Sequence, residues 1–128
     1  MKSPLPTDAE LAILNILWAK GSATVRDVHE ALGAEETGYT TVLKTMQIMV
    51  GKQLVERDES ERSHVYRAAV HEEPTQKRIV SDLIERAFNG SAARLAMRAL
   101  SIAPASKKEL DEVRAYLDAM EKKPRKKN

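Results

Sequence analysis

The chain has 128 residues, which is enough for one medium domain or two small ones with a modest core. It contains no cysteine, no apolar run long enough to cross a membrane, and no apolar signal-peptide core near its start. These features argue against disulfides, thiolate metal sites and membrane insertion, and they favour the cytoplasm.

The formal net charge of +2 is unevenly distributed along the chain. Positions 1–70 carry eight Lys and Arg against ten Asp and Glu, and positions 71–128 carry thirteen against nine. The average charge does not indicate a nucleic-acid binder, because phosphate binding needs clustered cations. Aromatic residues make up only 4%, which argues against base-stacking platforms for single-stranded nucleic acid.

Capping and stop signals predict three helices in the first half of the chain. The capping box TDAE at 7–10 opens a helix that should end at Gly21, and its apolar residues surround the axis, so we expect it to be buried. A short helix is expected over about Thr24–Leu32, with Gly33 as its stop. The third should run over about Gly38–Lys52.

The pattern then changes to two short strands, near Leu54–Arg57 and His64–Ala68, joined by a charged turn. Three helices followed by a hairpin is the order of a winged helix-turn-helix, and the short connection between the second and third helices suits that motif. We therefore expect a mostly α protein in which residues 1–72 form a winged-helix domain with a small β-hairpin wing.

The second half predicts three amphipathic helices. The first follows a polar junction at 71–76, has Pro74 in its first turn and ends at Asn89-Gly90; the second covers 91–102, and the third opens at the capping box 106–109. Their apolar stripes exceed what so small a chain can bury alone, so we expect residues 73–123 to form a three-helix dimerisation region of a homodimer. The alternative is a monomer in which they pack on the first module. The candidate dimer residues are Ile79, Leu83, Phe88, Leu95, Leu110, Val113, Leu117 and Met120.

The remaining residues, 124–128, are expected to form a basic, disordered tail.

The third predicted helix lies in a stretch without acidic residues, since Thr37 to Val55 contains two lysines but neither Asp nor Glu. At about 100° per residue, one side carries Thr40, Lys44, Gln47, Ile48 and Gly51, with Thr41 and Lys52 on a flank. The core side carries Tyr39, Val42, Met46, Met49, Val50 and Gln53. The first face suits DNA, because no carboxylate repels phosphate and Thr, Lys and Gln side chains can contact phosphates and base edges. An ordinary solvated face that lacks acids is the alternative.

The predicted hairpin adds cations to this picture. Arg62 and His64 lie in its turn, where a wing usually runs beside phosphates. The same hairpin contains Glu56, Asp58, Glu59 and Glu61, which oppose DNA binding unless they point away or pair with arginines.

The segments LPTDAELAILNILWAKGSATVRDVHEAL and YTTVLKTMQIMVGKQLVERDESERSHVYRA resemble the penicillinase-repressor family, which includes the methicillin-resistance and copper-transport repressors. The most telling parts are the pattern E-x-x-I-L-x-I-L-W at 10–18, the motif YTTV at 39–42 and the strand VYRA at 65–68, and the resemblance extends over roughly positions 4–122. It implies a homodimeric repressor that binds a palindromic operator through the third helix. The family's DNA contacts fall on Tyr39, Thr40, Thr41, Lys44, Thr45 and, in the wing, Arg62.

The chain departs from the family pattern in three places. Ile48 stands where many members have arginine, and Gln53 replaces the usual glycine. Arg98-Ala99 stands where the lactam-responsive members have the Asn-Phe bond that a protease cleaves to release repression, and the cysteines of the copper-responsive members are absent. A releasing protease is therefore an expectation of the resemblance alone.

The sequence favours neither an enzyme nor a metal or cofactor site. His29, His64 and His71 lack zinc-like spacing, and no catalytic triad or phosphate-binding glycine loop stands out. Two functions compete with the repressor: a winged-helix module that binds a protein partner, and an architectural protein that binds DNA without sequence preference.

Overall fold

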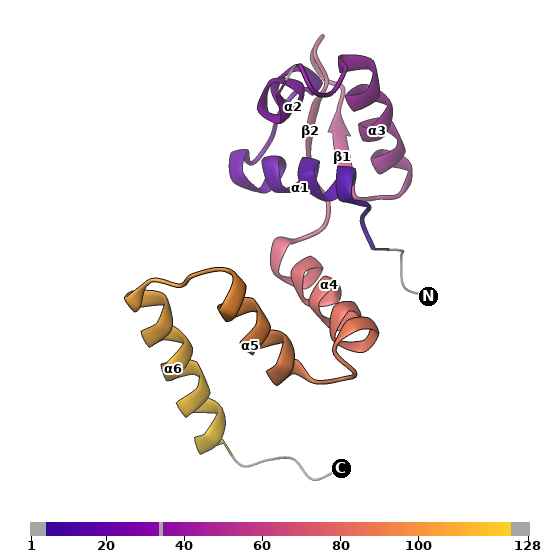
Figure 1. Ribbon diagram of the computed structural model, residues 1–128. Coiled ribbons are helices and arrows are strands. Elements are labelled where there is room, and N and C mark those ends of the chain that lie inside the picture. Colours follow the sequence, from indigo (N-terminus) through magenta and orange to yellow (C-terminus); the bar gives the residue numbers. More distant parts are fainter. Residues whose placement is uncertain (1–4, 34, 124–128) are drawn as a thin grey trace. The chain divides into compact units, whose positions relative to one another are not determined.

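The computed structural model describes residues 5–33 and 35–123, with a helical majority and one antiparallel hairpin (Figure 1). Its elements are α1 (Asp8–Lys20), α2 (Val25–Leu32), α3 (Tyr39–Gly51), β1 (Val55–Asp58), β2 (Val65–Ala68), α4 (Glu72–Ala87), α5 (Ala92–Ile102) and α6 (Lys107–Lys122). The expected order of three helices, a hairpin and three further helices is confirmed. The predicted basic tail at 124–128 lies outside the described residues.

Side-chain caps explain where the helices begin. The amide of Glu10 donates to the Thr7 hydroxyl at 3.2 Å and the Thr7 amide donates to the Glu10 carboxylate at 2.9 Å, which is the predicted capping box of α1. Ser106 and Glu109 form the second predicted box, at the start of α6. Thr24 and Asp27 form a further box at α2 that the usual sequence signature does not reveal, because its third helical residue is aspartate instead of glutamate.

The core lies between α1, α2, α3 and the hairpin. Its fully buried side chains come from each of these elements: Ile13, Leu14, Leu17, Val28, Val42, Met46, Met49 and Tyr66. Trp18 of α1 donates its indole N–H to the Val70 carbonyl at 3.0 Å, which joins α1 to the end of the hairpin. The expected burial of the first helix is therefore confirmed on its inner side.

The hairpin also pairs with the loop before α2. β1 and β2 are antiparallel with Val55 opposite Ala68, and Ala23 exchanges two backbone hydrogen bonds of 2.8 and 2.9 Å with Tyr66. Since Ala23 directly precedes the α2 cap, this bridge places the first turn of α2 beside β2, near the turn of the hairpin.

The turn from α3 into β1 uses a left-handed residue that is not glycine. Gln53 has φ 64°, and its amide donates to the Val50 carbonyl at 3.0 Å while the Leu54 amide donates to the Met49 carbonyl at 2.9 Å. This is a Schellman ending, in which glycine usually takes the position of Gln53. Gln53 therefore adopts the backbone conformation that favours glycine, and the expectation that it lies on the core side is wrong, because it is exposed.

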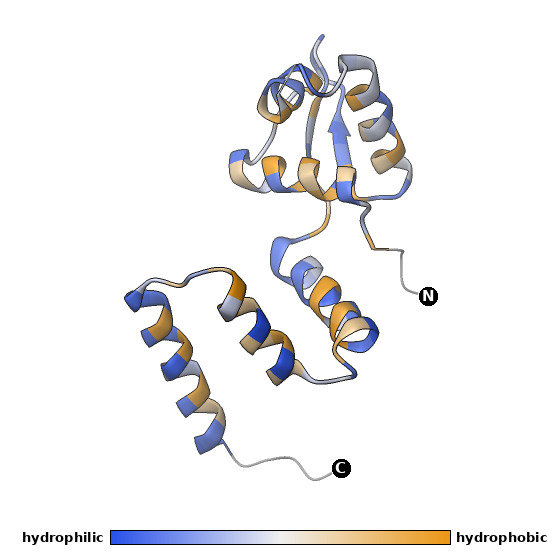
Figure 2. Cartoon of the chain, in the orientation of Figure 1, coloured by the Kyte–Doolittle hydropathy of each residue, from blue (hydrophilic) through white to orange (hydrophobic). Residues whose placement is uncertain are grey.

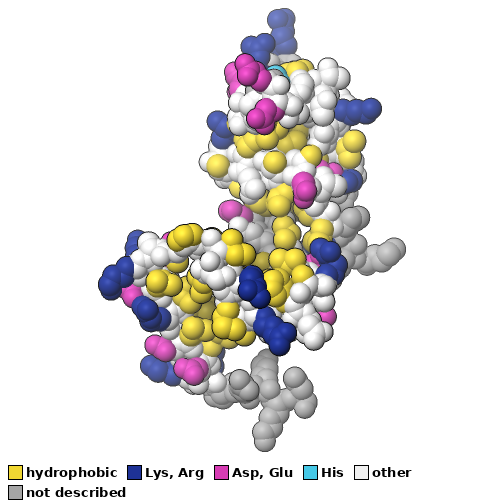
Figure 3. Space-filling view, in the orientation of Figure 1, with side chains coloured by type: hydrophobic (Ala, Val, Ile, Leu, Met, Phe, Trp, Pro, Cys, Tyr) yellow, Lys and Arg dark blue, Asp and Glu magenta, His cyan; other side chains and the backbone are white. Residues whose placement is uncertain are grey.

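The C-terminal helices lack a core of their own. The chain divides into two compact units between Ser81 and Asp82, inside α4, and no residue of α5 or α6 is buried. Figure 2 marks hydrophobic residues in orange along these helices, and Figure 3 shows hydrophobic side chains on their surface. The candidate dimer residues are half-buried (Ile79, Phe88, Leu95, Leu110 and Val113) or exposed (Leu83, Leu117 and Met120).

α4 starts at Glu72, so most of the polar junction at 71–76 is helical, and the expected place of Pro74 in the first turn is confirmed. Among the described residues, no helix is both long and apolar enough to cross a membrane.

We expect Gln53→Gly to raise the free energy of unfolding of the N-terminal unit by about 0.5–1 kcal/mol, because it relieves a left-handed conformation that costs a side-chain-bearing residue about 1–2 kcal/mol. The single tryptophan, Trp18, allows urea unfolding of this unit to be followed by fluorescence. The matched control is Gln47→Gly on the exposed side of α3, which should lower stability by about 1 kcal/mol. A destabilising Gln53→Gly would show that the turn depends on the glutamine side chain.

Candidate nucleic-acid interface

Packing determines which side of α3 faces outward. Val42, Met46 and Met49 are at most 1% exposed and hold the inner side against the core. The outer side presents Thr40, Thr41, Lys44, Gln47 and Ile48, all exposed. The angular placement of these residues from the sequence is confirmed, and α3 contains no acidic residue.

Tyr39, at the first position of α3, was placed toward the core by helix angle and lies instead on the surface, with 47% of its area exposed. The helix begins at this residue, so its side chain extends beyond the core that the later turns contact. The ring packs edge-to-face on His29 with ring centroids 5.7 Å apart, and His29 Nε2 lies 2.8 Å from the Thr37 carbonyl oxygen. His29 thus fixes the α2–α3 turn and the Tyr39 ring, a role for which the sequence carries no signal.

Thr45 is half-buried and its hydroxyl donates to the Thr41 carbonyl at 2.8 Å, one helical turn back. Its hydroxyl proton is therefore used within α3. This distinguishes Thr45 from Thr40 and Thr41, whose hydroxyls have no hydrogen-bond partner among the residues that the structure describes.

The wing pairs several of its acids internally. Glu59 accepts from Arg57 at 2.7 Å, Glu56 accepts from Arg67 at 3.1 Å, and Asp58 accepts from the Ser60 amide at 2.9 Å. The objection raised by the acids of the hairpin is thereby reduced, although Glu61 remains exposed.

Arg62 and His64 are both exposed at the end of the hairpin. Within the described residues, Arg62 has no carboxylate within ion-pair distance. It is therefore a wing cation available to an external anion.

An ion pair with a buried carboxylate holds the C-terminal end of α3. Lys52 Nζ lies 2.7 Å from Glu10 Oε2, and the Glu10 side chain is 4% exposed. Burial alone would raise the pKa of Glu10, but hydrogen bonds from Lys52 and from the Thr7 amide outweigh it and hold that pKa below its usual 4.5. Lys52, which the sequence placed on the flank of the DNA face, is thus engaged with α1.

The described residues contain no group of three or more His, Asp or Glu side chains arranged to hold a metal ion. His64 and His71 therefore belong to no such group, and His29 contacts the Tyr39 ring and the Thr37 carbonyl oxygen.

This chain is similar to a known family and to two curated proteins. A family model described as penicillinase repressor matches residues 6–119. Two curated proteins called "Transcriptional regulator BlaI", from Mycobacterium tuberculosis strains CDC 1551 / Oshkosh and ATCC 25618 / H37Rv, are each 42% identical over 66 residues. The match covers 50% of this chain and 47% of each relative, so the chain spans about half the length of the curated relatives it matches.

We expect Lys52→Met to lower the free energy of unfolding by about 1–2 kcal/mol at pH 7, because it leaves the Glu10 carboxylate buried without its cation. The folded pKa of Glu10 is depressed, so the contribution of the pair is complete above the unfolded pKa near 4.5 and is lost as the pH falls through the folded pKa. The difference between the wild type and Lys52→Met should accordingly shrink below that pH in urea titrations.

Lys44→Met is the matched control for this experiment, since Lys44 is an exposed lysine of the same helix. It should change stability by no more than about 0.5 kcal/mol at any pH. An equal loss in both variants, or a Lys52→Met loss that persists at low pH, would contradict the role of the ion pair.

Proposed function

The chain belongs to the penicillinase repressor family, and we propose that it represses transcription by binding double-stranded operator DNA with the outer face of α3. The observation that carries this proposal is the exposure of Thr40, Thr41, Lys44 and Gln47 together on a helix without acidic residues. In a chain with 19 Asp and Glu, this face can approach phosphates without repulsion. Residues 1–72 would then form the DNA-binding domain, and the protein would act in the cytoplasm, where its operator would lie.

Each side chain of this face has a chemistry suited to the major groove. Lys44 can donate to guanine acceptors or to phosphate, and Gln47 can pair with an adenine edge. The exposed threonines can donate to phosphate or offer their methyl groups to thymine. Ile48, 48% exposed where many family members have arginine, would replace a charged contact by an apolar contact with thymine methyl groups.

The helices of residues 73–123 are proposed to form a homodimer. Leu117 and Met120 of α6 are 53% and 56% exposed, and a monomer that leaves such residues in water forgoes their burial. A second copy offers the same stripe and would cover it by two-fold symmetry. Two copies of α3 would then read two half-sites of a palindromic operator, about one DNA turn or ~34 Å apart. A protease that releases repression would be a further partner, and this rests on the family resemblance alone.

We expect Lys44→Ala to weaken binding to the duplex upstream of the regulated gene by about tenfold, as the loss of one charge-assisted contact implies. Fluorescence anisotropy with labelled duplex would measure this at moderate salt, with scrambled duplex as competitor. Lys108→Ala, which removes an exposed lysine of α6, is the matched control and should leave affinity unchanged.

The two competing functions give different results in the same titration. Equal affinity for cognate and scrambled duplex would indicate an architectural protein without sequence preference. No saturable binding to either duplex would favour a module whose exposed Ile48 contacts a protein partner. Unchanged affinity in Lys44→Ala would reject this face of α3 as the DNA-binding surface.

We expect analytical ultracentrifugation to give the wild type twice the 14.3 kDa mass of one chain. Leu117→Gln should shift the mass toward that of the monomer, because the substitution places a polar group in the proposed dimer interface. Operator affinity should fall with it, since a monomer binds only one half-site. Glu112→Gln, on another side of α6, is the control and should remain dimeric. A monomeric wild type that binds the palindrome with full affinity would overturn the dimer.

A further inference from the structure

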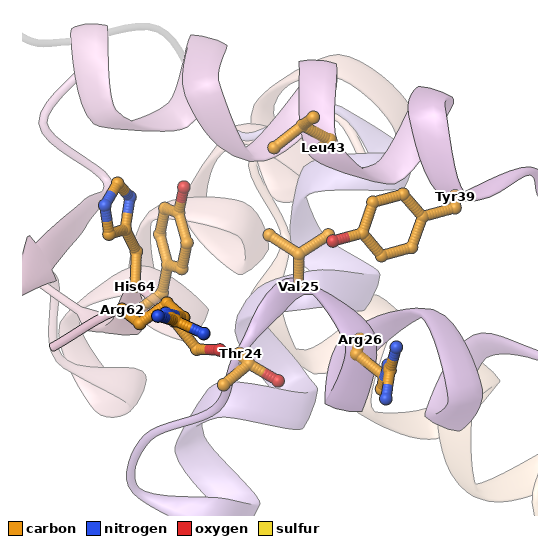
Figure 4. A pocket seen from close by; sticks show the side chains of 9 residues that line it. Thr24, Val25, Arg26, Tyr39, Leu43, Arg62 and His64 are labelled. Carbon is orange, nitrogen blue, oxygen red and sulfur yellow. The ribbon is translucent and has the colours of Figure 1, made fainter. Parts of the chain in front are cut away.

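A pocket lies between the start of α2, the start of α3 and the wing, within the N-terminal unit (Figure 4). Its volume is about 390 Å³, and it is lined by Thr24, Val25, Arg26, Tyr39, Leu43, Arg62, Ser63, His64 and Tyr66. The backbone bridge between Ala23 and Tyr66 brings the α2 cap, Thr24, beside β2, and both Thr24 and Tyr66 line the pocket. Nothing in the sequence pattern singled out Thr24, Arg26 or Ser63 as binding residues.

The pocket contains two arginines and no acidic residue. Arg26 comes from α2 and Arg62 from the wing, so residues 36 positions apart in the chain bring positive charge to one concavity. Neither guanidinium has a carboxylate within ion-pair distance among the residues that the structure describes. The acid next to Arg26 in sequence, Asp27, accepts a hydrogen bond from the Thr24 amide at 3.1 Å and so serves the α2 capping box.

Neutral donors supplement the two cations. Figure 4 shows the Tyr39 hydroxyl directed toward Val25, with Arg62 and His64 on the wing side of the pocket and Arg26 on the α2 side. The Tyr39 ring is fixed by His29, so this hydroxyl is held in place at little further entropic cost. Two guanidinium groups with hydroxyl donors are the set of groups that bind a phosphate.

We propose that this pocket binds one phosphate of the DNA backbone, held jointly by Arg26 and Arg62 with the Tyr39 hydroxyl. The inference rests on the proposed function, because the ligand is part of the duplex that α3 would read. A backbone phosphate is favoured over a free anion because Tyr39 is the first residue of α3, so the pocket is continuous with the exposed face of that helix. The contact would set the register of the domain on the duplex, while the α3 face reads bases.

The consequence is that Arg26 and Arg62 act on the same phosphate and are energetically coupled. The test uses the full-length chain with Arg26→Gln, Arg62→Gln and the double variant, and with Arg94→Gln on α5 as the control for charge. Both pocket arginines are exposed, so each variant should fold, and Trp18 fluorescence is used to check that it does. Each backbone phosphate of the operator duplex is replaced in turn by a neutral methylphosphonate, and affinity is measured by anisotropy.

We expect one phosphate in each half-site at which the methylphosphonate weakens wild-type binding by about tenfold, the loss typical of a charge-assisted hydrogen bond. At this position the methylphosphonate should weaken operator binding by Arg26→Gln or Arg62→Gln much less than binding by the wild type. It should not weaken operator binding by the double variant any further. The double variant should also lose less affinity than the two single losses combined. Arg94→Gln should behave as the wild type at every position.

Three results would overturn the pocket assignment without rejecting the proposed function. One is additive losses, with each arginine coupled to a different phosphate. Another is a wild type that binds the operator and depends on Lys44 but shows no phosphate coupled to Arg26, which rejects the pocket and leaves the proposed function standing. The third is that inorganic phosphate at constant ionic strength competes with the operator and that Arg26→Gln abolishes this competition, while no methylphosphonate position weakens binding. The pocket would then bind a free anion. A wild type without operator binding would reject the proposed function and the pocket together.

Discussion

The burial of Val42, Met46 and Met49 is the constraint on which the proposed interface depends. These three side chains lie on one side of α3 and are enclosed by the core, so the rotation of the helix about its axis is fixed. A rotation that exposed them would cost roughly 1.5–3 kcal/mol for each residue. The exposed set of Thr40, Lys44, Gln47 and Ile48 therefore follows from the packing, and its neutral-to-basic character follows from the sequence.

Other contacts fix the two ends of α3 and the elements beside it. Lys52 joins the C-terminal end to the buried Glu10 of α1, and His29 holds the ring of Tyr39 at the N-terminal end. The Ala23–Tyr66 bridge then places α2 beside the wing. Recognition of DNA by this geometry would need little movement of the backbone, because the helix that carries the contacting side chains is packed on the core.

Local signals in the sequence predicted the helices well, because capping boxes and glycine stops depend on residues within one turn. The boxes at Thr7 and Ser106 and the stop at Gly21 are of this kind. The contacts between distant residues were not predicted: the Glu10–Lys52 pair joins positions 42 apart, and nothing local to either residue indicates the other. Helix angle misplaced Tyr39 and Gln53, because Tyr39 is the first residue of α3 and Gln53 lies beyond its end at Gly51, in a left-handed conformation. The pocket was missed for the same reason as the ion pair, since Arg26 and Arg62 line one concavity only in the folded chain.

Contact between the outer face of α3 and the operator can be observed residue by residue, through the amide-proton chemical shifts of the ¹⁵N-labelled chain titrated with operator duplex. We expect the largest shifts at Thr40, Thr41, Lys44, Gln47 and Ile48, with smaller shifts at the end of the wing and none on the outer side of α1. Shifts concentrated on α1 or on the C-terminal helices, with the α3 amides unmoved, would contradict the assignment of α3 as the helix that reads DNA.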